Sequence, residues 1–221
     1  MARITLTFDN GPEPRWTNHV LDVLAKRGLK ASFFIIGRKL ATSREGRDAV
    51  ERAKREGHWI GNHSYNHVYS LGDIDRADAV DVEVVKTFDV LGDLAHPDML
   101  FRPFCNAGIL DQRVFKGVDV ERVQAAGYSC ILFNSVPRDW EHKDAWVARA
   151  LEDVSRRDWT TIVLHDIAGY PDGVDVRPML MLDEFIGRAT DAGHTFEQDY
   201  SPDCVLISKG KRLRDLGHLS H

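Results

Sequence analysis

The sequence predicts an α/β fold built on a mostly parallel sheet, either open or closed into a barrel. Short strand-like runs alternate with segments of helical periodicity along the whole chain, which is the pattern of strand–helix units. Ionisable or metal-ligand side chains follow five of the predicted strands, and in a parallel barrel those strand ends open onto one face. The length of 221 residues fits one domain, which we place at residues 1–221.

The N-terminal part of the chain shows the alternation most clearly. Apolar residues alternate with polar ones over residues 4–8, which predicts a strand that ends at Asp9. The turn at residues 11–14 contains prolines placed to start a helix, and residues 16–24 repeat apolar side chains at helical spacing. Residues 31–36 are almost all apolar, as expected for a strand that is buried on both faces.

The same alternation continues towards the C-terminus. We expect further strands at residues 58–61, 99–101, 130–133, 161–164 and 205–207. We expect further helices at residues 49–55, 80–91, 120–126, 145–154 and 179–189. The sequence contains no linker or low-complexity stretch between these segments, which favours a single domain.

The composition argues against several classes of partner. The chain is 43% hydrophobic and 29% charged, as in folded globular proteins. Its 29 Lys and Arg against 34 Asp and Glu give a net charge of -5. Proteins that bind nucleic acid or anionic membranes carry an excess of basic residues, which this chain lacks. The apolar runs fall far short of the roughly 20 residues of a membrane helix. The N-terminus enters a strand pattern without signal-peptide features, which predicts a cytoplasmic protein.

The three cysteines are Cys105, Cys130 and Cys204, and no pair of them has CxxC spacing. This pattern argues against a disulfide framework and against a cysteine-based zinc site. We interpret Cys130 and Cys204 as small buried hydrophobic residues.

Two short motifs contain side chains suited to catalysis. His63 and His67 are four residues apart, so on a helical turn they would share one face and could bind one metal ion. The alternative interpretation of this pair is a surface or core-edge position. Asp9 and Asn10 follow a strand and precede Gly-Pro, which by itself favours a turn, although a general base beside a metal ligand has the same composition.

Taken together, these motifs resemble those of the polysaccharide deacetylases of carbohydrate esterase family 4, also called the NodB homology domain. The family's Thr-Phe-Asp-Asp-Gly-Pro is matched with one change at residues 7–12, and its His-Ser/Thr-x-x-His is matched in full at residues 63–67. Its Arg-Pro-Pro-Tyr-Gly is matched in part at residues 102–106, its Asp-Trp at residues 139–140 and its late Leu-His at residues 164–165. Each motif is loose, but five in order at strand ends make a specific match.

The resemblance implies a distorted (β/α) barrel of the TIM-like, NodB type that hydrolyses an N-acetyl or similar amide bond. It implies that Asp9 is the general base and that His165 is the general acid. It also implies that Arg102 holds the base, and that Asp139 holds Arg102 or tunes its neighbours.

The resemblance further implies a divalent metal, with zinc the first choice, at three ligand positions. Those positions are occupied here by Asn10, His63 and His67. A carbohydrate or small amide substrate would contact Cys105, Trp140 and Tyr65, and a backbone N–H near Cys105 would help to form the oxyanion hole.

The chain departs from the family pattern at or beside these positions. Asn10 replaces the metal-binding aspartate, and a neutral amide oxygen compensates a cation less than a carboxylate does. Phe104, Cys105 and Asn106 replace Pro, Tyr and Gly in the third motif, and Val136 replaces an aspartate that often precedes the fourth. These changes indicate a substrate other than a plain N-acetylglucosamine polymer.

Three functions follow as expectations. The first is metal-assisted N-deacetylation of an N-acetylated sugar. The second is metal-independent hydrolysis of a small cyclic amide or ureide, of the allantoinase or imidase kind, and Asn10 motivates it. The third is a catalytically silent carbohydrate-binding protein, against which the retained acid and base positions argue.

Overall fold

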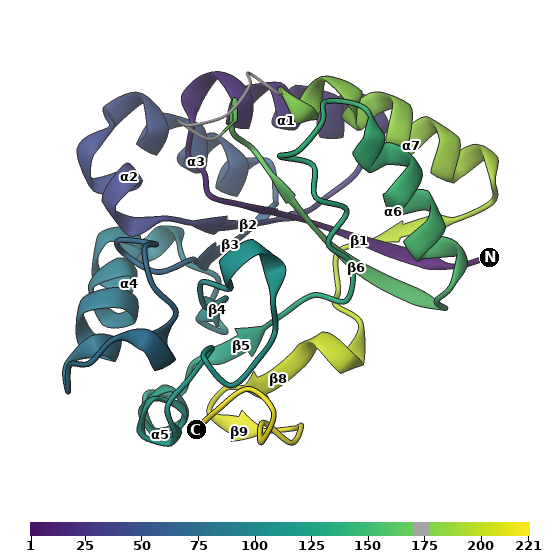
Figure 1. The fold of residues 1–221 in the computed structure, drawn as a ribbon. Helices are drawn as coiled ribbons and strands as arrows, with labels where there is room; N and C mark the ends of the chain where they lie inside the picture. The colour runs from purple at the N-terminus through teal and green to yellow at the C-terminus, as the bar shows by residue number, and fades with distance from the viewer. Residues whose placement is uncertain (170–176) are drawn as a thin grey trace.

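The structure is a computed structural model that describes residues 1–169 and 177–221. These residues form one nine-stranded sheet that curls into an open, distorted barrel, with the helices on its outside (Figure 1). The strands are β1 (Arg3–Asp9), β2 (Ser32–Ile35), β3 (Trp59–Asn62), β4 (Leu100–Phe101), β5 (Ser129–Ile131), β6 (Trp159–His165), β7 (Thr195–Glu197), β8 (Val205–Ser208) and β9 (Lys211–Arg212). The α-helices are α1 (Pro14–Arg27), α2 (Gly37–Thr42), α3 (Arg44–Arg55), α4 (Lys86–Leu91), α5 (Gly117–Ala125), α6 (Ala145–Ser155) and α7 (Leu182–Asp191).

The sheet is parallel along most of its width, which confirms the predicted fold class. Its order is β6-β1-β2-β3-β4-β5-β8-β9, and β7 pairs with the start of β1. All pairs from β6 across to β5 are parallel, whereas β8 pairs antiparallel with β5 and β9 pairs antiparallel with β8. The last residue of β1, Asp9, lies opposite His165 of β6 on one side and Phe34 of β2 on the other. This register brings the ends of three strands together.

Most predicted elements are present, with boundaries displaced by a few residues. The segment predicted as one helix at residues 80–91 instead begins as a π-helix, η2 (Asp81–Val85), and continues as α4. The helix predicted at residues 179–189 begins as a short 3-10 turn, η5 (Pro178–Met181), before α7. Three short elements, α2, β7 and β9, were not expected. None is long enough to show a hydrophobic period, since α2 has six residues, β7 has three and β9 has two.

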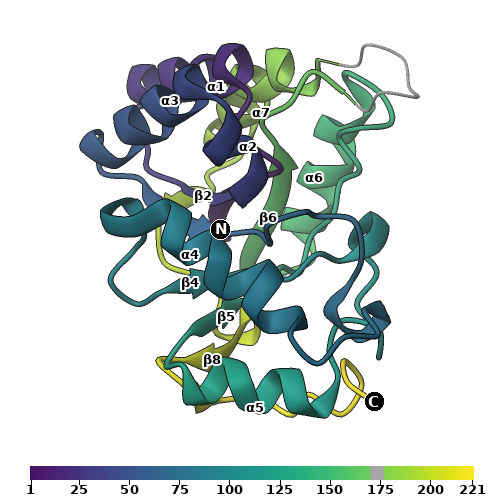
Figure 2. The same cartoon turned by 90° about the vertical axis from the view of Figure 1, so that its left-hand side faces the viewer.

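Helix α1 forms where its sequence predicts it. Pro14 stands in the first turn, and Gly28 ends the helix with a φ of 66°, a backbone conformation that glycine adopts without steric cost. The apolar residues that face the sheet, including Val20 and Leu24, are fully buried. Figures 1 and 2 show α1, α3 and α7 side by side on one side of the barrel, and the C-terminus beside α5.

Strand β1 is buried on both faces, although apolar and polar side chains alternate along it. Its threonines Thr5 and Thr7 are fully buried on the face opposite Ile4, Leu6 and Phe8. The Thr7 hydroxyl donates a hydrogen bond of 2.7 Å to the Ile162 carbonyl, which satisfies its polar group inside the fold. The interior next to β1 is therefore polar as well as buried.

Cys130 and Cys204 are buried free thiols, as predicted, and Cys105 is a half-buried free thiol. Among the described residues, no helix combines the length and the apolar character that crossing a bilayer requires.

Candidate active site

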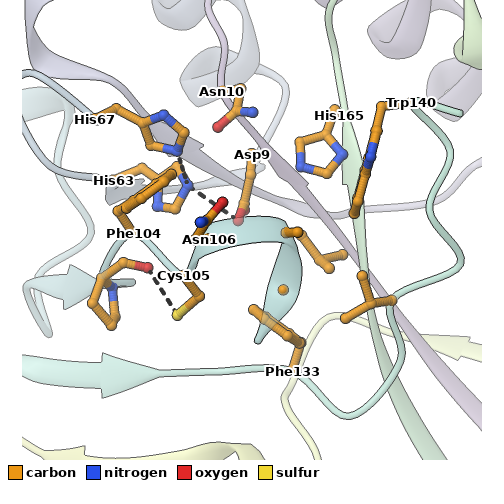
Figure 3. Close-up of a pocket in the computed structure, with 15 residues that line it drawn as sticks. Asp9, Asn10, His63, His67, Phe104, Cys105, Asn106, Phe133, Trp140 and His165 are labelled. Atoms are coloured by element: carbon orange, nitrogen blue, oxygen red, sulfur yellow. Dashed lines mark hydrogen bonds and ion pairs between the residues drawn. The ribbon is translucent and has the colours of Figure 1, made fainter. Parts of the chain in front are cut away.

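A cavity of about 360 Å³ opens at the carboxyl ends of the parallel strands (Figure 3). Its wall is formed by the ends of β1 and β6 and by segments that follow β3, β4 and β5. Seven of the ten predicted site residues line it: Asp9, Asn10, His63, His67, Cys105, Trp140 and His165. Figure 3 shows Asp9 between the two histidines of the second motif and His165.

Asp9 is held in place by a buried ion pair. Arg102 is fully buried, and its Nη1 donates to Asp9 Oδ1 at 2.8 Å and to the Thr7 hydroxyl at 2.7 Å. The other Arg102 nitrogens donate to the carbonyl oxygens of Ile131 and Leu132, at 3.1 and 3.0 Å. Because backbone and side-chain acceptors fix the guanidinium, it can hold the carboxylate in one orientation.

His165 is held by a second buried carboxylate, that of Asp139. His165 Nδ1 lies 2.8 Å from Asp139 Oδ1, and the His165 backbone N–H donates to Asp139 Oδ2 at 2.9 Å. The sequence suggested that Asp139 holds Arg102 or tunes its neighbours; in the structure its two oxygens bond to His165. The cavity therefore has two separate pairs, Asp9 with Arg102 and His165 with Asp139.

His63 and His67 converge, but not on a helical turn as their spacing suggested. Residues 63–67 form an irregular turn after β3, in which Ser64 and His67 have φ values of 66° and 55°. His67 Nε2 lies 3.0 Å from His63 Nε2, which in turn lies 3.4 Å from Asp9 Oδ2. His63 Nδ1 contacts the Arg102 carbonyl oxygen at 2.9 Å and can donate to it, which leaves the Nε2 lone pair facing His67.

Asn10 lies on a tight turn that packs against the strand carrying His165. Its φ of 71° lies in the left-handed region, which asparagine tolerates better than most residues. The next residue must be glycine, because a Cβ on Gly11 would lie within 2.6 Å of the Asp166 carboxylate. The turn can therefore approach the end of β6 closely.

Burial shifts the pKa values of the ionisable side chains that line the cavity. It raises the pKa of Asp9, with Arg102 and His165 opposing the rise. It lowers the pKa of His63 to about 3 and that of His67 well below its usual range, so both imidazoles are neutral near pH 7. Burial also disfavours charge on His165, but the nearby carboxyl groups, Asp139 first and then Asp9 and Asp166, together outweigh it, and the pKa of His165 is raised.

The three predicted substrate contacts do not all reach the cavity. Trp140 lines it, with its ring edge-on to His165 at a centroid distance of 5.1 Å. Cys105 also lines it, and burial raises the pKa of its thiol, which therefore stays protonated. Tyr65 is not among the lining residues. Its ring lies beneath the Lys86 ammonium, 3.7 Å from the ring centroid, because the turn directs it towards α4.

Sequence reasoning missed two buried carboxylates beside the site. Asp166 follows His165 directly and is fully buried, with the Thr17 hydroxyl donating to it. A charged residue next to a strand-end histidine was a signal that could have identified it. Glu83 bonds to the turn that carries His67, but it lies in a segment with apolar helical spacing and gave no signal.

The chain is similar in sequence to known polysaccharide deacetylases. Residues 2–103 match the polysaccharide deacetylase family profile. A peptidoglycan-N-acetylglucosamine deacetylase of Bacillus cereus is 32% identical over 167 residues, which are 74% of this chain and 72% of that protein. A chitooligosaccharide deacetylase of Rhizobium leguminosarum bv. trifolii is 30% identical over 167 residues, 74% of this chain and 71% of that protein.

Solved structures show the same fold. A family 4 acetyl xylan esterase from Clostridium thermocellum, in complex with a cobalt ion, superposes with a TM-score of 0.68 at 26% identity, covering 89% of this chain and 87% of that one. Sequence motifs, the open barrel and these relatives lead to one conclusion. The chain belongs to the polysaccharide deacetylase family of enzymes.

Proposed function

We propose that this protein removes N-acetyl groups from an amino sugar of a carbohydrate substrate, by hydrolysis of the linear amide C–N bond. One observation carries the proposal: Asp9 and His165, each fixed by its own buried partner, face the same cavity from adjacent strands. Relatives named as N-acetylglucosamine and chitooligosaccharide deacetylases support it.

Asp9 is suited to act as the general base. Arg102 engages Oδ1, while Oδ2 lies on the side of His63. Burial raises the pKa of Asp9, which makes its ionised form a stronger base. In the proposed reaction this carboxylate takes a proton from the attacking water, whose oxygen bonds to the acyl carbon.

His165 is suited to act as the general acid. Because Asp139 engages Nδ1, the proton that is available for transfer is on Nε2. The raised pKa keeps a larger fraction of His165 protonated near neutral pH. His165 then protonates the leaving nitrogen as its bond to the acyl carbon breaks, so one water molecule yields acetate and a free amine.

The residues present fit a divalent metal ion, with zinc as the first choice. Two neutral imidazole nitrogens, of His63 and His67, point to one place, and Asn10 lies beside them (Figure 3). No three His, Cys, Asp or Glu residues in the described ranges are grouped to hold a metal, so the amide of Asn10 would complete the set. When bound, the metal would polarise the substrate carbonyl and lower the pKa of the attacking water.

The cavity wall suits an uncharged sugar. Phe104, Phe133 and Trp140 supply apolar surface, and Trp140 can pack against a sugar ring. Lys and Arg are absent from the lining among the described residues, so neither residue type is present there to pair with a substrate carboxylate. Cys105, as a neutral thiol, forms part of the wall, and we assign the oxyanion contact to a backbone N–H in its vicinity.

The two alternatives have less support. The two deacetylases described above are named for peptidoglycan N-acetylglucosamine and chitooligosaccharide and not for cyclic amides, which favours a linear amide. A silent binding protein would not need an acid and a base that are each oriented by a buried carboxylate or guanidinium.

Acetate release from N-acetylated chitooligosaccharides tests the proposal. Protein loaded with zinc or cobalt should release acetate and free amine in equal amounts, whereas His63→Ala and Asp9→Ala should not. An exposed change, Asp144→Asn, serves as the matched control. Turnover that survives both site substitutions would contradict the assignment. A rate on a cyclic ureide that chelators do not change would favour the metal-independent alternative.

A further inference from the structure

The turn that carries His67 needs support from outside itself. Ser64 and His67 both have φ values in the left-handed region, which costs free energy for residues other than glycine. A backbone in such a conformation persists where its surroundings fix it. The contacts of this turn therefore determine where the His67 imidazole lies.

Helix α2 fixes one side of the turn. The backbone N–H of Gly37 donates to the Ser64 carbonyl at 3.0 Å, and that of Arg38 donates to the Tyr65 carbonyl at 3.0 Å. Both donors belong to the first turn of the helix, where N–H groups have no partner within the helix. They satisfy the carbonyl groups of the turn but not its N–H groups.

Glu83 fixes the other side. Its side chain is buried, at 7% exposure, and Oε2 accepts from the backbone N–H groups of Tyr65 and Asn66, at 3.1 and 2.9 Å. Oε1 accepts from Asn66 Nδ2 at 2.6 Å. Among the described residues, these three N–H donors are the hydrogen-bond partners of the Glu83 side chain, and they satisfy its buried oxygens.

Glu83 lies in the π-helix η2, a rare element that often occurs at functional sites. A second link joins this helix to the start of the turn: Asn62 Nδ2 donates to the Val84 carbonyl at 2.8 Å, and Asn62 Oδ1 accepts from the Ser64 N–H at 2.9 Å. The irregular helix thus bonds to the turn at both ends of the Ser64–Asn66 stretch.

We propose that Glu83 is a positioning residue that places His67 for metal binding. The inference rests on the metal site of the proposed function. Without the carboxylate, two backbone N–H groups next to His67 would lose their acceptor, and the strained turn would relax. His67 Nε2 would then leave its place 3.0 Å from His63 Nε2 (Figure 3).

A carboxylate suits this position better than an amide, because it only accepts hydrogen bonds. All three partners of Glu83 are donors, and an amide would direct an NH₂ group at one of them. Glu83→Gln should therefore retain part of the effect, and Glu83→Ala should lose it.

The test is titration of the metal-free protein with Co²⁺, followed by visible absorption. Glu83→Ala should weaken Co²⁺ binding about 10–100-fold, as loss of a residue behind a metal ligand does, and Glu83→Gln should weaken it less. Asp81→Asn is the matched control, because Asp81 lies in the same π-helix but pairs with Arg122 at the surface. If Glu83→Ala does not fold, the Co²⁺ affinity of Glu83→Gln is compared with that of Asp81→Asn. Weaker binding by Glu83→Gln supports the role of Glu83, and equal binding contradicts it.

A second readout separates this inference from the proposed function. NMR of the metal-free protein reports the imidazole nitrogens, and Glu83→Ala should change the signals of His67 while leaving those of His165 in place. If the wild type binds no Co²⁺, the metal site of the proposed function is wrong and this inference fails with it. If the wild type binds Co²⁺ but folded Glu83→Ala binds it equally well with unchanged His67 signals, only the role of Glu83 is refuted.

Discussion

Asp139 bonds twice to His165, once to the ring Nδ1 at 2.8 Å and once to the backbone N–H at 2.9 Å. The ring contact fixes the tautomer, and the backbone contact fixes the residue relative to β6. The negative charge also raises the pKa of His165 against the effect of burial. Asp139 thus orients the proposed acid and makes the largest contribution among the carboxyl groups that raise its pKa.

Replacing Asp139 by asparagine should therefore change the pH dependence of kcat/KM. The acid must be protonated, so activity is lost as the pH rises through the pKa of His165. Without the Asp139 charge that pKa falls, and the alkaline limb should move to lower pH, with a lower maximum. Measurement of kcat/KM against pH tests this, with Asp144→Asn as control. An unchanged alkaline limb would show that Asp139 does not tune the acid.

Replacing Asn10 by aspartate should strengthen metal binding. A carboxylate compensates the charge of a divalent cation, whereas the present amide is neutral. Aspartate also tolerates the φ of 71° at this position. Isothermal titration with Zn²⁺ should show a tighter complex, by about tenfold or more. Equal affinities in both proteins would place the metal away from residue 10.

Asp166 should make the protein less stable as the pH rises. Burial raises its pKa from 3.8 to about 7, so the folded state holds a proton that the unfolded state has lost. This contribution to stability is present below pH 3.8 and is lost as the pH rises through about 7, a change of up to roughly 4 kcal/mol.

The test compares Asp166→Asn with the wild type by urea unfolding at several pH values. The side chain at position 166 cannot ionise in this variant. Its free energy of unfolding should therefore increase relative to that of the wild type as the pH rises from acid to neutral. Asp191→Asn, at the exposed end of α7, is the control. A constant difference between Asp166→Asn and wild type would mean that Asp166 does not titrate in this range.

The sequence predicted which strand ends carry the site, because hydrophobic periodicity locates strands and parallel strands end at one face. It could not predict how the turn at His67 folds, because two residues there have left-handed conformations that spacing does not reveal. It also left the partner of Asp139 open, because the contact with His165 joins segments 26 residues apart. Tyr65 was predicted to contact the substrate, and its true direction depends on the conformation of the same turn, which spacing does not reveal.

The central claim is that Asp9 is the base of a sugar N-deacetylase, and Asp9→Asn tests it most directly. Asparagine can still accept the hydrogen bond from Arg102 but cannot take a proton. Acetate release from N-acetylated chitooligosaccharides should fall about 10²–10⁴-fold. The melting temperature should fall as well, because asparagine leaves the charge of the buried Arg102 uncompensated, so the rate is compared for folded protein below that temperature. Acetate release by Asp9→Asn at the wild-type rate would contradict the account.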